Sequence, residues 1–240
     1  MDILPVHIDK EITSSDNIVD LILNSTDVQD GDVVVIAQKV ISKQEGRVIE
    51  LSTITPSLLA EGISSQYQKD PRIVELILQE SKKIMRMERG IIIVETNHGY
   101  VCANAGIDES NVKNGHATLL PLNSDLSAQL IQKDIFNKTM KSVAVIISDT
   151  FGRPFRMGQT NVAIGVSGIN PILDYAGTKD SFENTLKVTA IAVADELSAA
   201  AELVMEKNSR CPVALIRNYD FTNDSSMLSL IRPENEDLFR

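Results

Sequence analysis

Residues 148–180 read SDTFGRPFRMGQTNVAIGVSGINPILDYAGTKD, and this stretch with its flanks decides the fold. It follows the apolar run Val143–Ile147, which predicts a buried strand because it is short, continuous and mostly β-branched. A second apolar run, Val162–Val166, predicts another strand, and Gly165 and Gly168 accompany it. The polar residues between the two runs are therefore expected at the end of buried strands, where they can form a site.

The residues that follow the first strand indicate a site that handles phosphate. Asp149 and Thr150 place a carboxylate and a hydroxyl at the strand end, and Arg153 and Arg156 follow around a proline. Mg²⁺ takes few protein ligands and completes its shell with phosphate oxygens and water. Arginine grips phosphate or carboxylate in bidentate fashion, and glycines permit close approach to a ligand. The alternative is an Asp–Arg salt bridge that only stabilises the loop.

Elsewhere, periodicity and turn residues predict a mixture of hairpins and helices. Strands are expected at Asp32–Val40, at Gly90–Glu95 and Tyr100–Ala103 as an antiparallel hairpin, and at Val213–Arg217. Helices are expected at Ile18–Leu23, from Pro71 (N-cap Asp70) to just before Gly90, and at Phe182–Glu206. This order lacks regular β-α-β alternation, so it favours an α+β fold with mixed and antiparallel sheets and packed helices over a doubly wound sheet.

The length of 240 residues suits one functional unit. We expect a single unit over 1–240 that is built from two intimately associated subdomains. One comprises residues 1–88 and 207–240, the N-terminal α/β part with its closing strand. The other, residues 89–206, carries the metal and substrate positions, and the boundary is expected near Met87–Gly90.

The composition excludes several classes of function. The net charge is −10, so the chain repels nucleic acids and anionic membranes unless a local basic patch intervenes. Aromatic residues are only 4% of the chain and there is no tryptophan, which counts against stacking on single-stranded nucleic acid. We see no signal peptide and no apolar run of roughly 20 residues. A cytoplasmic protein that binds neither nucleic acid nor membrane is expected.

The common signatures of nucleotide and metal sites are missing from the sequence. Neither G-x-x-x-x-G-K-[ST] nor G-x-G-x-x-G occurs, and the three histidines form no pair at helical metal-ligand spacing. Cys102 and Cys211 lie in or beside apolar segments, so we expect two buried thiols.

Two further segments carry polar residues that could converge on an anion. Gln38–Arg47 contains Lys39 and Lys43, which can act as point charges for phosphate or simply form a solvated basic loop. In Val101–Val112, Asp108 could donate oxygen to a hard cation and Asn111 could bond a nucleotide. The alternative for this segment is that Asp108 caps a helix with Asn111 on its first turn.

Together these segments resemble the gamma-glutamyl ligase family that matures the deazaflavin coenzyme F420. Five blocks match in the family's order and cover most of the chain: Val40–Arg47, His98–Val112, Ser148–Gly158, Val162–Asp180 and Val193–Met205. The resemblance implies an α+β fold particular to the family and an intertwined homodimer with the nucleotide in a groove at the interface. It also implies two divalent ions (Mg²⁺ or Mn²⁺), with K⁺ as a further candidate ion.

The reaction that the resemblance implies joins L-glutamate to the lactyl carboxylate of the precursor F420-0, with GTP as co-substrate, and then adds further gamma-linked glutamates. An acyl-phosphate mechanism fits this chemistry, because a carboxylate is unreactive toward amines until it is phosphorylated. The rival interpretations are another metal-dependent carboxylate–amine ligase and a non-catalytic GTP-binding regulator on the same scaffold.

The resemblance also assigns roles to individual residues. Asp108 and Asp149 are expected to bind one metal ion and Thr150 a second, while Arg153 and Arg156 are expected to bind the γ-phosphate or the substrate carboxylates. The GTP-binding residues are expected at Asp9, Lys10, Glu11, Ile12, Gln38, Lys39, Lys43, Asn111, Met205, Glu206, Lys207, Asn208, Ser209, Arg210 and Cys211.

The segment Met205–Pro212 departs from the family pattern. The family has a glycine-rich loop here, with an acidic or amide residue two places after the methionine that helps to hold the second metal and GTP. In this chain the corresponding residues are Glu206 and Lys207. Either Glu206 takes over as a metal ligand, or Lys207 replaces positive charge near the phosphates.

Overall fold

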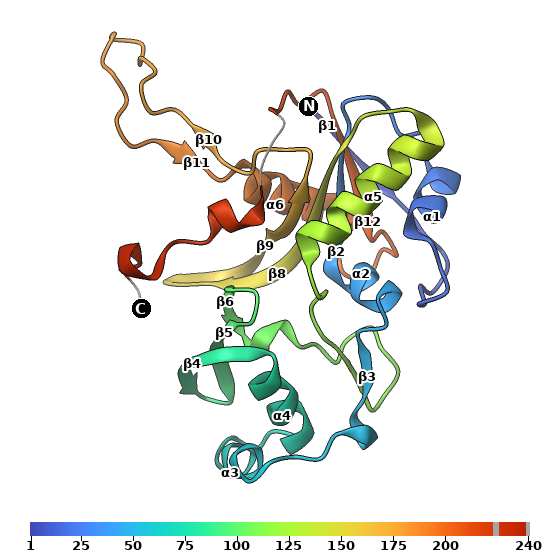
Figure 1. Ribbon diagram of the computed structural model, residues 1–240, viewed down its shortest axis with the longest axis vertical. Coiled ribbons are helices and arrows are strands. Elements are labelled where there is room, and N and C mark those ends of the chain that lie inside the picture. The colour runs from blue at the N-terminus through green and yellow to red at the C-terminus, as the bar shows by residue number, and fades with distance from the viewer. Residues whose placement is uncertain (223–225, 239–240) are drawn as a thin grey trace.

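The computed structural model describes residues 1–222 and 226–238, and a five-stranded sheet forms its centre (Figure 1). The strand order is β1 (Asp2–Val6), β12 (Val213–Arg217), β2 (Val33–Ala37), β8 (Ala144–Arg153) and β9 (Arg156–Ser167). Among these strands β2 and β8 pair in parallel, and the other neighbours pair antiparallel. The predicted α+β fold with mixed and antiparallel sheets is confirmed.

Helices cover both faces of this sheet. In Figure 1, α5 (Ser124–Thr139) lies in front of it with α1 (Ile18–Ser25), and α6 (Val193–Met205) lies behind it. The side chains of β2 from Val33 to Ile36 and of β8 from Ala144 to Ile147 are consequently buried on both faces. Strands buried on two faces read as continuous apolar runs, which explains why this pair was visible in the sequence.

A second part of the molecule lies below the sheet in Figure 1 and has its own cluster of buried side chains, drawn from Leu51 to Leu119. Its elements are β3 (Val48–Glu50) paired with β7 (His116–Thr118), the helices α3 (Leu58–Tyr67) and α4 (Pro71–Gln79), and the sheet β4 (Ser81–Glu88), β5 (Ile91–Thr96) and β6 (Val101–Ala103). The expected subdomain boundary near Met87–Gly90 falls at the turn between β4 and β5. The division of the chain into 1–88 plus 207–240 and 89–206 stays a prediction.

The remaining elements are short. They are α2 (Gln38–Gln44), the pair β10 (Leu173–Asp174) and β11 (Ala190–Ile191), and the 3₁₀ turns η1 (Leu51–Thr53), η2 (Asn104–Gly106), η3 (Met227–Leu230) and η4 (Glu234–Glu236). The β10–β11 pair forms the base of an arm that projects from the body in Figure 1. None of the helices built from the described residues has the length and hydropathy of a membrane span.

Several predicted elements are confirmed near their expected positions. The helix at Ile18–Leu23 is α1, the hairpin at 90–103 is β5–β6, and the closing strand at Val213–Arg217 is β12. The two apolar runs form the β8–β9 hairpin, whose strands are longer than predicted. The expectation that Asp149 and Thr150 lie at a strand end is wrong, because both are paired with β9 inside β8. Short-range signals specify all of these elements.

Three predicted boundaries are wrong. The strand at Asp32–Val40 ends at Ala37, because the helix formers of Gln38–Gln44 begin α2 there. The helix from Pro71 ends at Gln79 rather than near Gly90, since Ser81–Glu88 pairs with β5 despite its many helix-forming residues. The helix at Phe182–Glu206 begins only at Val193, because the preceding residues enter the arm and pair with β10.

The glycines of the second apolar run serve packing rather than ligand approach. A Cβ at Gly165 would lie 2.4 Å from the carbonyl carbon of Ser124, so this glycine lets the start of α5 contact β9. Gly168 has a φ of +75°, and a Cβ there would lie 2.0 Å from the side-chain nitrogen of Gln132. Both positions are set by the helix packed on the sheet.

The N-cap of α4 provides a test of local stability. The side chain of Asp70 accepts a hydrogen bond from the backbone N–H of Arg72 at 2.9 Å, with Pro71 at the first helical position. We expect Asp70→Ala to lower the free energy of unfolding by ~1 kcal/mol, measured by chemical denaturation. Asp70→Asn, which keeps a capping oxygen, should lose less at neutral pH.

The same residue predicts a pH dependence. Hydrogen bonding to the Arg72 side chain lowers the pKa of Asp70 below its ordinary value. A carboxyl with a depressed folded-state pKa stabilises the fold above its unfolded pKa, and this contribution is lost as the pH falls through the folded pKa. The difference in stability between the parent and Asp70→Asn should therefore shrink when denaturation is repeated at progressively lower pH; an undiminished difference would contradict this assignment.

Candidate functional site

The candidate site lies where β2 ends and its parallel pairing with β8 stops. Ala37 pairs with Ser148 at the last register position of β2 and β8. Gln38 leaves the sheet there to begin α2, whereas Asp149 stays in β8 and pairs with Val162 of β9. Ligands commonly bind outside the carboxyl ends of parallel strands. Gln38 and Ser148 are each 2% exposed, and their side-chain oxygens Oε1 and Oγ have no hydrogen-bond partner within the described part of the chain.

Asp149 is the central acidic group of this edge. Its Oδ1 accepts a hydrogen bond from the backbone N–H of Thr150 at 2.8 Å. Burial raises the pKa of Asp149 to about 6, and the nearby carboxylate of Asp108 adds to the rise. The ammonium groups of Lys207 and Lys39 and the Thr150 N–H act in the opposite direction. Four charged side chains from separate segments therefore share one electrostatic environment.

Asp108 reaches this edge from the loop that follows β6. A β-bridge with Thr118 holds its backbone, and its side chain accepts a hydrogen bond from the backbone N–H of Ser110 at 2.7 Å. The Lys39 ammonium lies 2.7 Å from Oδ2. Burial disfavours the charged form, but the hydrogen bonds from Lys39 and Ser110 outweigh it, so the pKa of Asp108 lies below its ordinary value. No helix begins at Asp108, so the helix-cap alternative is wrong.

A polar network extends from Thr150 on the other side of Asp149. The Thr150 hydroxyl donates to Oδ1 of Asn161 at 2.7 Å and accepts from the Lys207 ammonium at 2.5 Å. Asn161 Nδ2 donates to Oε2 of Glu202 at 3.0 Å, and Lys207 Nζ lies 3.7 Å from Oε1 of Glu202. Lys207 thus joins the end of α6 to the β8–β9 hairpin.

Two of the residues expected to bind the nucleotide, Lys43 of α2 and Glu11 of the N-terminal segment, contact each other. The ammonium of Lys43, whose side chain is 13% exposed, is ion-paired with the exposed carboxylate of Glu11. Lys10 pairs instead with Asp16. Asp9 is exposed, whereas Ile12 lies in the main hydrophobic core. Asn111 is exposed with a left-handed φ of 56°.

The loop after α6 lies against the N-terminal segment. The backbone N–H of Ile8 donates to the carbonyl oxygen of Arg210 at 3.1 Å, and a ring nitrogen of His7 lies 3.2 Å from the carbonyl oxygen of Ser209. Met205 and Cys211, at the two ends of the loop, are buried, and Asn208 is exposed.

The two arginines lie apart from the aspartates in the same chain. Arg153 and Arg156 pair with each other at the exposed tip of the β8–β9 hairpin. The Arg153 guanidinium donates to the carbonyl oxygen of Met157 at 2.6 Å, so no Asp149–Arg153 salt bridge is formed. Arg153 lies four positions after Asp149 along an extended strand, or roughly 13 Å at 3.3 Å per residue. Their role toward substrate stays a prediction.

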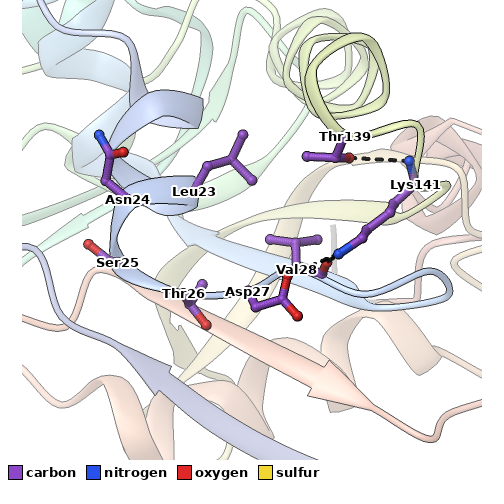
Figure 2. A pocket seen from close by; sticks show the side chains of 8 residues that line it. All are labelled: Leu23, Asn24, Ser25, Thr26, Asp27, Val28, Thr139 and Lys141. Atoms are coloured by element: carbon purple, nitrogen blue, oxygen red, sulfur yellow. Dashed lines mark hydrogen bonds and ion pairs between the residues drawn. The ribbon is translucent and has the colours of Figure 1, made fainter.

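A surface hollow at the other end of β2 does not share this chemistry. Figure 2 shows it between the end of α1 and the turn after α5. The Lys141 ammonium there is ion-paired with Asp27 at 3.0 Å and donates to the carbonyl oxygen of Val28 (Figure 2). The Lys141 ammonium thus stabilises the loop that leads into β2. Asp108 and Asp149 do not line this hollow.

Comparison with known proteins decides the family. The model of the family described as F420-0:Gamma-glutamyl ligase matches residues 8–218. The chain belongs to this family. A Coenzyme F420:L-glutamate ligase of Methanothermobacter thermautotrophicus is 48% identical over 218 residues, which span 89% of this chain and 86% of the relative. The protein of the same name from Methanocaldococcus jannaschii is 48% identical over 216 residues, with the same two coverages. That of Methanopyrus kandleri is 39% identical over 242 aligned positions, which cover 98% of this chain and 96% of the relative.

In this F420-0:gamma-glutamyl ligase family member, the residues at the edge of β2 and β8 fit one divalent ion. Asp108 and Asp149 supply two carboxylates, and Gln38 and Ser148 supply oxygens that lack other partners. Hard divalent cations take oxygen ligands of these kinds. No group of three or more acidic, cysteine or histidine side chains gathers around one point among residues 1–222 and 226–238. Phosphate and water would therefore complete the coordination shell.

Sequence reasoning missed Asn161 and Glu202. Asn161 is the cross-strand partner of Thr150 in the β8–β9 register, so a hairpin alignment of the two strands could have found it. Glu202 lies three residues before Met205 on α6, on a neighbouring part of the helix surface. Its approach to the hairpin depends on how α6 packs, which no local pattern encodes.

The two cysteines are buried thiols, as predicted. Burial raises the pKa of Cys102 to about 12, with the nearby Asp149 carboxylate as a smaller cause. A thiol with such a pKa is almost entirely protonated at neutral pH and is a poor nucleophile or metal ligand. Cys102 therefore lines the acidic end of the site as a small apolar group.

Proposed function

We propose that this chain is a GTP-dependent ligase that joins L-glutamate to F420-0 and then adds further gamma-linked glutamates, releasing GDP and phosphate. The observation that carries the proposal is the cluster of Asp108, Asp149, Lys39 and Lys207 at the end of β2, where its parallel pairing with β8 stops. Acidic groups that can hold a divalent ion, flanked by cations that can hold phosphate, suit phosphoryl transfer. Membership of the F420-0:gamma-glutamyl ligase family supplies the substrate class.

The proposed chemistry has two balanced steps. An oxygen of the substrate carboxylate attacks the γ-phosphorus of GTP, the bond to the β-phosphate breaks, and GDP leaves. The glutamate nitrogen then attacks the carbonyl carbon of the acyl phosphate, phosphate leaves, and the nitrogen loses a proton. Positioning and electrostatic stabilisation provide most of the catalysis in reactions of this type.

The chain's own residues have separate tasks in these steps. Asp108 and Asp149 would hold Mg²⁺ or Mn²⁺, which supplies charge stabilisation at phosphate oxygens when bound. Lys43 would exchange its present partner Glu11 for phosphate oxygens of GTP. Lys39, on the turn of α2 next to Gln38, would hold Asp108 in place and add positive charge.

Arg153 and Arg156 are proposed to bind the γ-phosphate or the substrate carboxylates from the tip of a partner subunit's hairpin. Phe155 and Met157 at the same tip are 89% and 94% exposed, which suits contact with a second copy of the chain. We therefore propose a homodimer of about 2 × 26.3 = 52.6 kDa, which light scattering coupled to size-exclusion chromatography can measure. A role for K⁺ stays a prediction.

Mass spectrometry of F420-0 after incubation with the protein, GTP, L-glutamate and Mg²⁺ or Mn²⁺ tests the proposal. A product heavier by one or more glutamyl residues, with equivalent release of GDP, would support it and give the number added. Unchanged precursor in the presence of folded protein and bound GTP would overturn it. ATP in place of GTP and other carboxylate acceptors, run in parallel, measure the specificity for each substrate.

A further inference from the structure

The polar network around Thr150 is already complete without a metal ion. The Thr150 hydroxyl donates a hydrogen bond to Oδ1 of Asn161 and accepts one from the Lys207 ammonium. The carboxylate of Glu202 receives the Asn161 amide at 3.0 Å and lies 3.7 Å from the same ammonium. Thr150 Oγ1, Asn161 Oδ1 and Glu202 Oε2 therefore each accept a hydrogen bond already.

The Lys207 ammonium also supplies a positive charge next to Thr150. Lysine carries a compact positive charge with three donors, which matches one hydroxyl and one carboxylate nearby. The Lys207 ammonium also acts on the Asp149 carboxylate, so it balances negative charge from two sides. A divalent ion bound to Thr150 would have to displace this ammonium or lie against it, and like charges at such distances repel strongly.

Glu206 does not restore a ligand at this position. It ends α6 with a left-handed φ of 47°, and its side chain is exposed. The residue of the loop that contacts Thr150 is its neighbour Lys207. The residues around Thr150 thus do not fit a second divalent ion. Those around Asp108 and Asp149 fit one although Lys39 is paired with Asp108, because two carboxylates and the unpartnered oxygens of Gln38 and Ser148 are present there.

We propose that the ammonium of Lys207 takes the place of a second divalent cation, so that each chain binds one divalent ion and carries its own second positive charge. The inference rests on the proposed function for what that charge does, which is to face the phosphates of the nucleotide. The observation behind the inference is the contact of Lys207 with Thr150 in this chain, which excludes the second ion.

Counting bound metal ions tests this without reference to turnover. Mn²⁺ alone is titrated into the full-length protein, and the free ion is measured by electron paramagnetic resonance. The parent should bind about one Mn²⁺ per chain, and Lys207→Glu, which exchanges the ammonium for an oxygen ligand, should bind about two. Lys207→Gln offers an uncharged oxygen ligand and is the second variant if the first fails to fold.

A matched charge reversal controls for the general effect of added negative charge. Lys82 is exposed on β4, in the lower part of the molecule, and Lys82→Glu should leave the count at about one. Two strongly bound ions in the parent would overturn the inference, as would an unchanged count in both folded Lys207 variants. If the parent binds one ion but makes no glutamylated product, the proposed function fails while the metal count stands. If it binds two and still makes product, only the inference fails.

Discussion

The Asp149→Asn variant should lose about 10²- to 10³-fold in the rate of glutamyl transfer while remaining folded. Metal ions and their ligands contribute several kcal/mol of charge stabilisation in phosphoryl transfer, and each 1.4 kcal/mol corresponds to about tenfold in rate. The amide of asparagine retains one oxygen but removes the negative charge that balances Lys207, Lys39 and a bound cation.

The stability of the same variant should be nearly unchanged. The carboxylate of Asp149 is desolvated, as its raised pKa shows, so its charge is not a favourable term in folding. Thermal melting and product formation should therefore separate: a parent-like melting temperature with a large loss of rate. Asp27→Asn, at an exposed carboxylate outside the site, is the control and should retain full activity. An active, folded Asp149→Asn protein would remove Asp149 from the mechanism.

The largest loss of stability is expected for Gly165→Ala. The new methyl group would lie 2.4 Å from the carbonyl carbon and 2.5 Å from Cβ of Ser124, where only backbone movement can relieve the overlap. Helix α5 is anchored at this point, because Asp125 accepts a hydrogen bond from the backbone N–H of Val166 at 2.8 Å. Overpacking of a tight core costs typically 1–3 kcal/mol, and contact with main-chain atoms favours about 3 kcal/mol or more.

Replacing a second glycine, Gly62, by alanine should raise the stability of the protein instead of lowering it. Gly62 lies in α3, and a Cβ there would meet nothing within 4 Å. Gly62→Ala should therefore stabilise the protein by about 0.5–1 kcal/mol, because alanine costs less backbone entropy in a helix. Differential scanning calorimetry should show Gly165→Ala melting roughly 6–12 °C below the parent and Gly62→Ala a few degrees above it. Equal melting temperatures for the two variants would contradict the packing assigned to Gly165.

The elements that local sequence specifies were predictable. The continuous apolar runs of β2 and β8 reflect burial on two faces, and Asp70-Pro71 encodes the start of α4 within four residues. The segment Ser81–Glu88 was not predictable in this way, because lysine, methionine and glutamate favour helix. Its strand conformation comes from pairing with β5.

The residues of the candidate site also fall into those that the sequence predicts and those that depend on tertiary packing. Lys39, Asp108 and Asp149 could be assigned to one place from the resemblance of their segments to a family, and the structure brings their charges together. Asn161 and Glu202 could not, since their positions depend on hairpin register and on the packing of α6. The sequence alone does not decide whether Glu206 becomes a metal ligand or Lys207 supplies positive charge, because the contact of Lys207 with Thr150 depends on tertiary packing.

The strand order of the main sheet has a consequence for how the protein is made. β12, near the end of the chain, lies between β1 and β2, which are separated from it by most of the sequence. During synthesis the ribosome delivers β1 and β2 long before the strand that joins them exists. Their edges must wait unpaired, and exposed edges invite association with other chains. A nascent chain of this protein should therefore depend on chaperones until residue 217 has emerged, because closing so long a loop is slow.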